Sequence, residues 1–194
     1  MDVLLSLGAD INATDVDGAT PLYSAAVKGY SEVELKLVAV DADVTIPSAG
    51  NDDKDITALH CVAENGNIML AKALLQKGAN VNAITARNAS PIFYAVRNNH
   101  VNMVQLLLEH GADCNGTGQD GWNSLLIASF IGSEECLELL LDADASVTAL
   151  DGMKRNAIHL AAEKEHMGCI RVLKGKILSL YSDTVLSFSG FTSN

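Results

Sequence analysis

The chain has 194 residues, enough for one domain with a sizeable core, and 48% of them are hydrophobic, so the composition favours a folded protein over a disordered one. Its 24 acidic and 13 basic residues give a net charge of −11, and an acidic chain repels a phosphate backbone, which argues against nucleic-acid binding. No segment reaches the roughly 20 apolar residues that a membrane helix needs, so membrane insertion is not expected.

The N-terminal segment, Met1-Asp2-Val3-Leu4-Leu5-Ser6-Leu7, has a short apolar run and no basic region before it, unlike a signal peptide. The four cysteines form no CxxC pair. Together these features predict an intracellular protein, cytoplasmic or nuclear. The segment reads as the end of a helix whose partner helix is missing, so we expect the chain to be a piece of a longer protein or gene product.

A four-residue motif recurs along the chain. It is found at Thr20-Pro21-Leu22-Tyr23, Thr57-Ala58-Leu59-His60, Ser90-Pro91-Ile92-Phe93, Asn123-Ser124-Leu125-Leu126 and Asn156-Ala157-Ile158-His159, with starts 37, 33, 33 and 33 residues apart. The first residue is always Thr, Ser or Asn, which can cap a helix N-terminus. Pro21 and Pro91 stand at the first helical position, where no donor is lost. Each motif therefore predicts the start of a short helix.

A second motif runs in step with the first. It is found as Gly8-Ala9-Asp10-Ile11-Asn12, Gly78-Ala79-Asn80-Val81-Asn82 and Gly111-Ala112-Asp113-Cys114-Asn115. The glycine suits a left-handed residue just after a second helix. Asp41 and Asp144 replace it in two units and should strain those helix ends slightly. The pairs Asp17-Gly18 and Asp120-Gly121 predict hairpin-like turns between units.

The 33-residue unit with both motifs in register resembles the ankyrin repeat. The resemblance implies an all-α solenoid of stacked helix-turn-helix units joined by short hairpin-like turns. We assign the units as 1–13 (partial), 14–46, 47–83 (with an insertion around 47–55), 84–116, 117–149 and 150–176 (degenerate), followed by a C-terminal tail at 177–194. The last helix should degrade after Leu173, and the tail should be an irregular cap or a frayed end.

Residues with catalytic potential fall at repeated positions. His60 and His159 share the fourth place of the motif, which favours a hydrogen-bonding role between repeats over metal binding or catalysis. Cys61, Cys114, Cys136 and Cys169 stand where other units carry apolar residues and read as small buried hydrophobes. No nucleotide, zinc or nucleophile motif is present in the sequence. We expect no enzyme activity, no catalytic residue, no metal and no cofactor.

The resemblance implies a non-catalytic scaffold that binds a protein or peptide partner through turn tips and first helices, which line a concave groove, and no small-molecule substrate. Apolar residues there suggest an anchor. We predict partner-binding residues Arg87, Arg97, Trp122, Phe130, Ile131, Met153 and Arg155. The alternative is that these apolar residues are covered by the C-terminal tail or pack inside the solenoid.

Three further readings remain open. The string Gly121-Trp122-Asn123-Ser124-Leu125 is similar to segments of ankyrin-repeat substrate receptors of ubiquitin ligases, so the chain could be such an adaptor. It could also be the ankyrin region of a larger signalling or channel protein. Asn12 and Asn115 resemble sites of an asparaginyl hydroxylase, although a hydrogen-bonded turn asparagine is the simpler reading.

Overall fold

The computed structural model of the chain describes residues 7–50 and 54–189, with the backbone alone beyond residue 180. The predicted N-terminal helix end falls mostly on residues outside this range. The described elements are α2 (Pro21–Lys28), α3 (Ser31–Ala39), α4 (Ala58–Asn65), α5 (Ile68–Gln76), α6 (Pro91–Arg97), α7 (Val101–Glu109), the 3-10 helix η1 (Gln119–Gly121), α8 (Ser124–Ile131), α9 (Glu134–Asp142), α10 (Ala157–Glu163) and α11 (Met167–Ser189).

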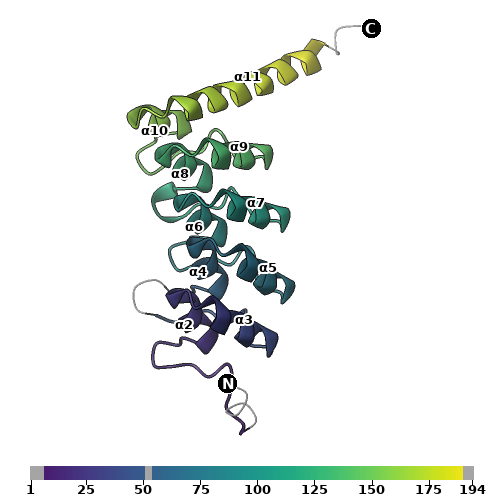
Figure 1. Ribbon diagram of the computed structural model, residues 1–194. Coiled ribbons are helices and arrows are strands. Elements are labelled where there is room, and N and C mark those ends of the chain that lie inside the picture. The colour runs from purple at the N-terminus through teal and green to yellow at the C-terminus, as the bar shows by residue number, and fades with distance from the viewer. Residues whose placement is uncertain (1–6, 51–53, 190–194) are drawn as a thin grey trace.

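The helices stack in two columns (Figure 1). The first helices α2, α4, α6, α8 and α10 contact one another in order, and the second helices α3, α5, α7, α9 and α11 do the same beside them. The connecting turns lie along one edge of the stack. The chain is thus an all-α solenoid, as its sequence predicted. We number its repeats from the first complete helix pair, so that α2 and α3 form the first and α10 and α11 the fifth.

The core lies between the columns and between successive repeats. The third motif position is 2% exposed at Leu22 and 0% exposed at Leu59, Ile92 and Leu125. Small residues such as Ala26, Ala63 and Ala128 are also 0% exposed. Burying each large side chain contributes about 1.5–3 kcal/mol, and the small ones let neighbouring helices approach closely.

Several predicted helix caps are present. Thr20, Asn123 and Asn156 each accept a hydrogen bond from the backbone three residues on, at 3.1, 2.9 and 3.0 Å. Ser90 differs, because its side chain makes no capping bond. Asp41 and Asp144 take left-handed conformations with φ of 60° and 59° where glycine stands in other repeats. Most of the predicted cap residues and left-handed positions therefore mark the helix ends correctly.

The insertion in the second repeat is closed at its base by an antiparallel pair. The Ser48 N–H donates to the Ile56 carbonyl at 2.8 Å, and the Asp55 N–H donates to the Ser48 carbonyl at 2.9 Å. Gly18 of the preceding turn lies so close that a Cβ there would stand 2.7 Å from the Ala49 Cβ. The described part of the insertion thus lies on the turn edge, and the helical stack continues past it.

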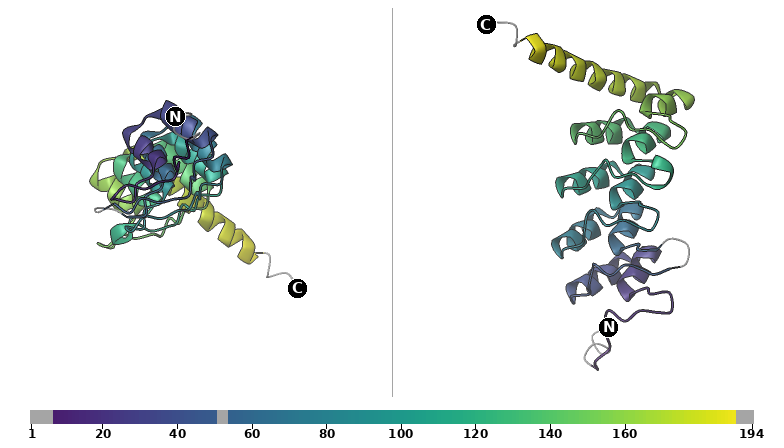
Figure 2. Two further views of the ribbon diagram at one scale, coloured as in Figure 1. Left: turned by 90° about the horizontal axis from the view of Figure 1, so that it is seen from below. Right: turned by 180° about the vertical axis from the view of Figure 1, so that it is seen from behind.

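The C-terminal segment differs from the prediction. Instead of degrading after Leu173, the last helix α11 continues to Ser189, and its end leads away from the stack and from the turn edge (Figure 2). Leu173 is buried and Ile177, one turn on, is half-buried. A glycine in a helix interior costs only about 1 kcal/mol relative to alanine, so Gly175 alone does not end the helix. The prediction of an irregular cap at residues 177–189 was wrong.

Candidate functional site

Trp122 and Phe130 form an aromatic pair on the fourth repeat. Trp122 follows η1 and Phe130 lies near the end of α8; both are half-buried. Their ring centroids are 5.5 Å apart at an angle of 84°, an edge-to-face arrangement. The Lys164 ammonium lies 4.7 Å from the Phe130 centroid, within cation–π range. The result is an aromatic surface with a positive charge at one side.

Arg155 braces the turn of the fifth repeat. Its guanidinium lies 2.8 Å from both Asp151 and Glu163. Burial opposes ionisation of Asp151, but hydrogen bonds from the backbone and side chain of Arg155 outweigh it and lower the pKa of Asp151. Hydrogen bonding to Asp151 in turn raises the pKa of Arg155. Arg155 therefore holds the turn in place, in addition to being near the predicted surface.

A hollow of about 380 Å³ separates the turns of the fourth and fifth repeats. Its lining residues are Asp120, Trp122, Asp151, Gly152, Met153 and Arg155. Met153 is 76% exposed at its rim. The structure thus brings together Trp122, Phe130, Met153 and Arg155 of the predicted residues, through the ring pair and the shared hollow. Helix α11 leads away from them, so its described part does not cover this surface.

The other predicted residues lie elsewhere on the same face. Arg97 pairs with Glu64 at 2.6 Å and lies 4.8 Å from the Tyr94 ring centroid. Arg87 is exposed on the turn of the third repeat, and Ile131 is half-buried at the end of α8. Arg97 is therefore part of a separate cluster one repeat away from Trp122.

That cluster borders a second hollow, of about 200 Å³. It lies along α2, α4 and α6 and is lined by Tyr23, Val27, Ile56, His60, Cys61, Glu64, Asn65 and Tyr94. The sequence prediction missed Tyr94. Its position is occupied by Cys61 and Ile127 in neighbouring repeats, so it reads as core, and only its aromatic character could have marked it.

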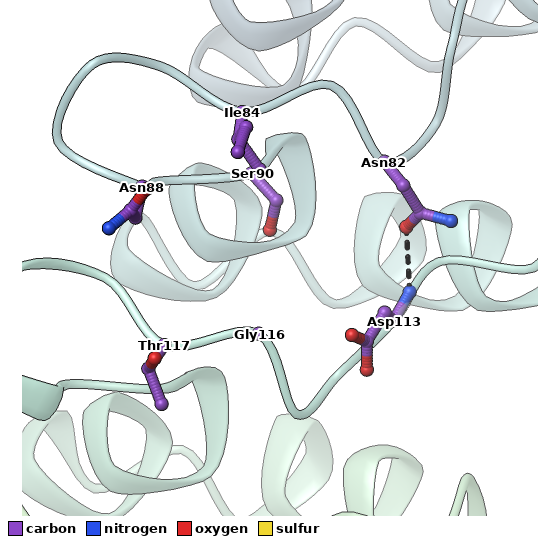
Figure 3. A pocket seen from close by; sticks show the side chains of 7 residues that line it. All are labelled: Asn82, Ile84, Asn88, Ser90, Asp113, Gly116 and Thr117. Atoms are coloured by element: carbon purple, nitrogen blue, oxygen red, sulfur yellow. Dashed lines mark hydrogen bonds between the residues drawn. The ribbon is translucent and has the colours of Figure 1, made fainter.

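A third hollow, of about 320 Å³, opens between the turns of the third and fourth repeats (Figure 3). It is lined by Asn82, Ile84, Asn88, Ser90, Asp113, Gly116 and Thr117. The Asn82 side chain accepts a hydrogen bond from the Asp113 N–H at 2.8 Å. Asn12 and Asn115 accept equivalent bonds from Asp43 and Ser146, also at 2.8 Å. These asparagines link successive repeats, as the simpler reading predicted.

The histidines also connect repeats. His60 is 1% exposed; its Nδ1 accepts from the Thr57 N–H at 3.1 Å. The proton is therefore on Nε2, which donates to the carbonyls of Ala83 and Ala89, each at 3.1 Å. His159 forms the same cap with Asn156 but is exposed. The predicted structural role is confirmed for His60.

The four cysteines are buried, as predicted, with exposures of 7% for Cys61, 3% for Cys114 and 0% for Cys136 and Cys169. Burial, with the nearby Glu64 and Glu34 charges, raises the pKa of Cys61 to about 12. A thiol with so high a pKa is a poor nucleophile at neutral pH. Among the described residues no cluster of His, Cys, Asp or Glu has the arrangement of a metal site.

No helix in the described part of the chain is long and apolar enough to cross a membrane. Four basic residues near the C-terminal end lie in different surroundings. Arg155 is neutralised in its turn, Lys164 lies over Phe130, and Arg171 and Lys176 line a hollow with Glu138 and Asp142. The aromatic surface of the fourth repeat is thus the more distinctive feature of the molecule.

Comparison with known proteins agrees with the architecture. Residues 46–118 match a family model described as ankyrin repeats (3 copies), and residues 103–141 match one described as ankyrin repeats (many copies). The chain is 31% identical over 175 residues to neurogenic locus notch homolog protein 1 of Mus musculus, covering 84% of this chain and 7% of that protein.

Two further relatives are similar over most of the chain. The ankyrin repeat and KH domain-containing protein mask-1 of Caenorhabditis elegans is 31% identical over 182 residues, 91% of this chain and 6% of that protein. The B-cell lymphoma 3 protein homolog of Mus musculus is 28% identical over 175 residues, 90% of this chain and 38% of that protein. The chain therefore spans a small part of each relative's length. With both motifs in register, stacked helix pairs and these matches, the chain belongs to the ankyrin-repeat family.

Proposed function

We propose that this chain is a non-catalytic scaffold that binds an intracellular protein or peptide through the surface formed by Trp122, Phe130 and Met153. The observation that carries the proposal is the half-buried aromatic pair beside a hollow of about 380 Å³, with Met153 76% exposed at the rim of that hollow. A partner side chain could enter the hollow between Trp122 and Met153. Aromatic anchors beside such pockets are typical of interaction hot spots.

Charge supports a specific role for this surface. Lys164 lies over Phe130, and Arg155 is held by Asp151 and Glu163. Lys164 thus places a cation beside the aromatic pair, and Arg155 lines the neighbouring hollow with its charge balanced by two carboxylates, within a chain whose net charge is −11. We expect Arg97 and Tyr94, with the second hollow, to extend the contact toward the N-terminal repeats, and Arg87 and Ile131 to lie at its margins.

The test starts with a partner captured from cell extract and then purified, so that its Kd can be measured. Trp122→Ala and Phe130→Ala should each weaken binding by about 30-fold, because loss of a hot-spot residue costs about 2 kcal/mol or more. Met153→Ala should weaken it less.

The matched control is Met69→Ala, since Met69 is 61% exposed in α5, in the other column of helices. It should leave the Kd unchanged. An unchanged Kd for both aromatic variants, with the fold intact by circular dichroism, would remove the proposed surface.

A further inference from the structure

The turn at residues Gly116–Trp122, called the Trp122 turn, lacks an internal brace that other turns have. In the third repeat the Thr85 hydroxyl accepts from the N–H groups of Arg87 and Ala89, at 3.2 and 3.4 Å. Asp151 in the fifth repeat accepts from Met153 and Arg155 at 2.9 and 2.8 Å, and Asp15 does the same in the first. The equivalent residue of the Trp122 turn is Gly118, which has no side chain to accept.

The preceding repeat also fails to hold this turn. His60 of the second repeat binds the carbonyls at both ends of the third-repeat turn, Ala83 and Ala89. Phe93 takes the place of His60 in the third repeat, and a phenyl ring cannot hydrogen-bond to the Trp122 turn. The fifth-repeat turn likewise follows an apolar residue, Leu126, but Asp151 and Arg155 brace it from within.

Backbone hydrogen bonds to the preceding repeat also distinguish the third-repeat turn from the Trp122 turn. The Ala86 N–H of the third-repeat turn donates back to the Lys54 carbonyl at 2.9 Å. Within the described residues the N–H of Gln119, the equivalent position, makes no such bond to the third repeat. Two backbone bonds close the Trp122 turn on itself: the Gly118 N–H donates to the Trp122 carbonyl at 2.6 Å, and the Trp122 N–H donates to the Gln119 carbonyl at 3.3 Å. The Gly152 N–H of the fifth-repeat turn donates to the Asp120 carbonyl at 2.7 Å. The turn is therefore hydrogen-bonded to one neighbouring turn only, and the third repeat meets it through the Phe93 ring beside Gly118.

Open space lies on both sides of the turn. The hollow of about 320 Å³ lies between it and the third repeat, and the hollow of about 380 Å³ lies between it and the fifth. In Figure 3 the Ser90 side chain points into the first of these, toward the Gly116–Thr117 backbone. Gly116 borders this space with no atom closer than 3.8 Å to a Cβ built on it, so the backbone is free to move there, whereas Gly118 and Gly121 lie close to Phe93 and Leu150.

We propose that the Trp122 turn moves as a unit in the free chain, carrying Trp122 off Phe130 and back, and that a bound partner fixes it in one position. The movement is a property of the free chain; only the effect of the partner rests on the proposed function. The surface is therefore adaptable at its aromatic anchor, and part of the binding energy is used to order the turn.

The experiment measures microsecond–millisecond exchange by NMR relaxation dispersion on the free chain. The single Trp gives one indole signal, and the amides of residues 83–89 serve as an internal control. We expect exchange at the Trp122 indole and in the Trp122 turn, and none in the control turn. Two results together would overturn the proposal. One is flat dispersion in both turns. The other is a hydrogen-exchange rate of residues 116–122, corrected for intrinsic rates, that lies within threefold of the rate of residues 83–89.

Two reciprocal variants locate the cause. Phe93→His with Gly118→Thr installs both braces of the third-repeat turn. Phe93 must be replaced first, because a Cβ at Gly118 would stand 3.1 Å from its ring. The double variant should suppress the dispersion and slow amide exchange of the Trp122 turn at least tenfold. Undiminished motion in this folded variant would contradict the proposed cause.

His60→Phe combined with Thr85→Gly removes both side-chain braces of the third-repeat turn. This variant should create motion in that turn, and serves as the reciprocal test if the first double variant does not fold. A rigid third-repeat turn in the folded His60→Phe, Thr85→Gly variant would count against the proposal. These readouts need no partner, so they fail or succeed separately from the loss of binding in Trp122→Ala.

Discussion

Two helices of the solenoid place different side chains at one structural position. The fourth residue of the second helix is Glu34 in α3 of the first repeat and Leu137 in α9 of the fourth. Both are buried, with exposures of 2% and 0%. The same position holds Ala71 and Val104 in the repeats between them, also 0% exposed. The backbone arrangement therefore buries whatever residue stands there.

The consequence for Glu34 is electrostatic. Its Oε2 atom has no hydrogen-bond partner among the described residues. Burial raises the pKa of its carboxyl group from 4.5 to about 7. A buried, unpaired carboxylate is destabilising, whereas Leu137 contributes hydrophobic burial at the same place. At neutral pH this position is therefore expected to destabilise the first repeat and to stabilise the fourth.

The largest expected effect comes from making the fourth repeat resemble the first. Leu137→Glu should destabilise the protein by about 3–5 kcal/mol at pH 8, since it removes apolar burial and adds an unpaired carboxylate. Urea unfolding followed by circular dichroism measures it. Glu138→Ala, at the exposed neighbouring position, should be nearly neutral; similar losses in both variants would mean that burial is not the cause.

The reverse change should stabilise the first repeat. At pH 8, Glu34→Leu should add about 3 kcal/mol to the local stability of α2 and α3, because a pKa raised from 4.5 to about 7 corresponds to that penalty. Amide hydrogen exchange of these helices gives the local free energy. Glu32→Leu at an exposed position is the control, and slower exchange should appear only in Glu34→Leu.

The pH profile should sharpen the same comparison. The pKa of Glu34 is higher in the folded state than in the unfolded state, so the folded state holds an extra proton between pH 4.5 and about 7. The stability that this extra proton gives to the folded state is fully present below about pH 4.5 and is lost as pH rises through about 7. The wild type should therefore lose stability relative to Glu34→Leu over this range, by up to about 3 kcal/mol. Parallel profiles would show that Glu34 does not titrate there.

The smallest effect is expected at the surface of the same repeat pair. The Lys77 ammonium lies 2.6 Å from the Asp41 carboxylate, and the two side chains are 45% and 81% exposed. Exposed ion pairs are screened by water and salt. Lys77→Ala should leave the melting temperature indistinguishable from that of the wild type, so a clear drop would mean that this pair holds the first two repeats together.

The sequence allowed much of the repeat geometry to be predicted. The cap residues Thr20 and Asn123, the left-handed Asp41 and Asp144, and the buried cysteines all follow from short-range patterns repeated in register. Glu34 was overlooked, although a charge at a position occupied by Ala71 and Leu137 is a readable signal. The length of α11 was predicted wrongly, because Gly175 and the neighbouring lysines read as a helix end, although one glycine costs a helix only about 1 kcal/mol.

The binding surface was only partly predictable. Trp122 and Met153 could be placed on turns by their spacing, and the structure joins them in one hollow. The cation over Phe130 and the pairing of Arg97 with Glu64 depend on side chains from different repeats. No sequence spacing specifies those two contacts, since each depends on how far one repeat is rotated and shifted against the next.

The sequence by itself determined the repeat, its helix starts and ends, and the buried positions, because these depend on hydrogen bonds and periodicity within some 33 residues. Only the tertiary structure decided which turns are braced and which side chains meet across repeats. His60 and Phe93 occupy the same motif position, and each faces the turn of the following repeat. His60 hydrogen-bonds to that turn, whereas Phe93 cannot. That contact exists only when the repeats stack.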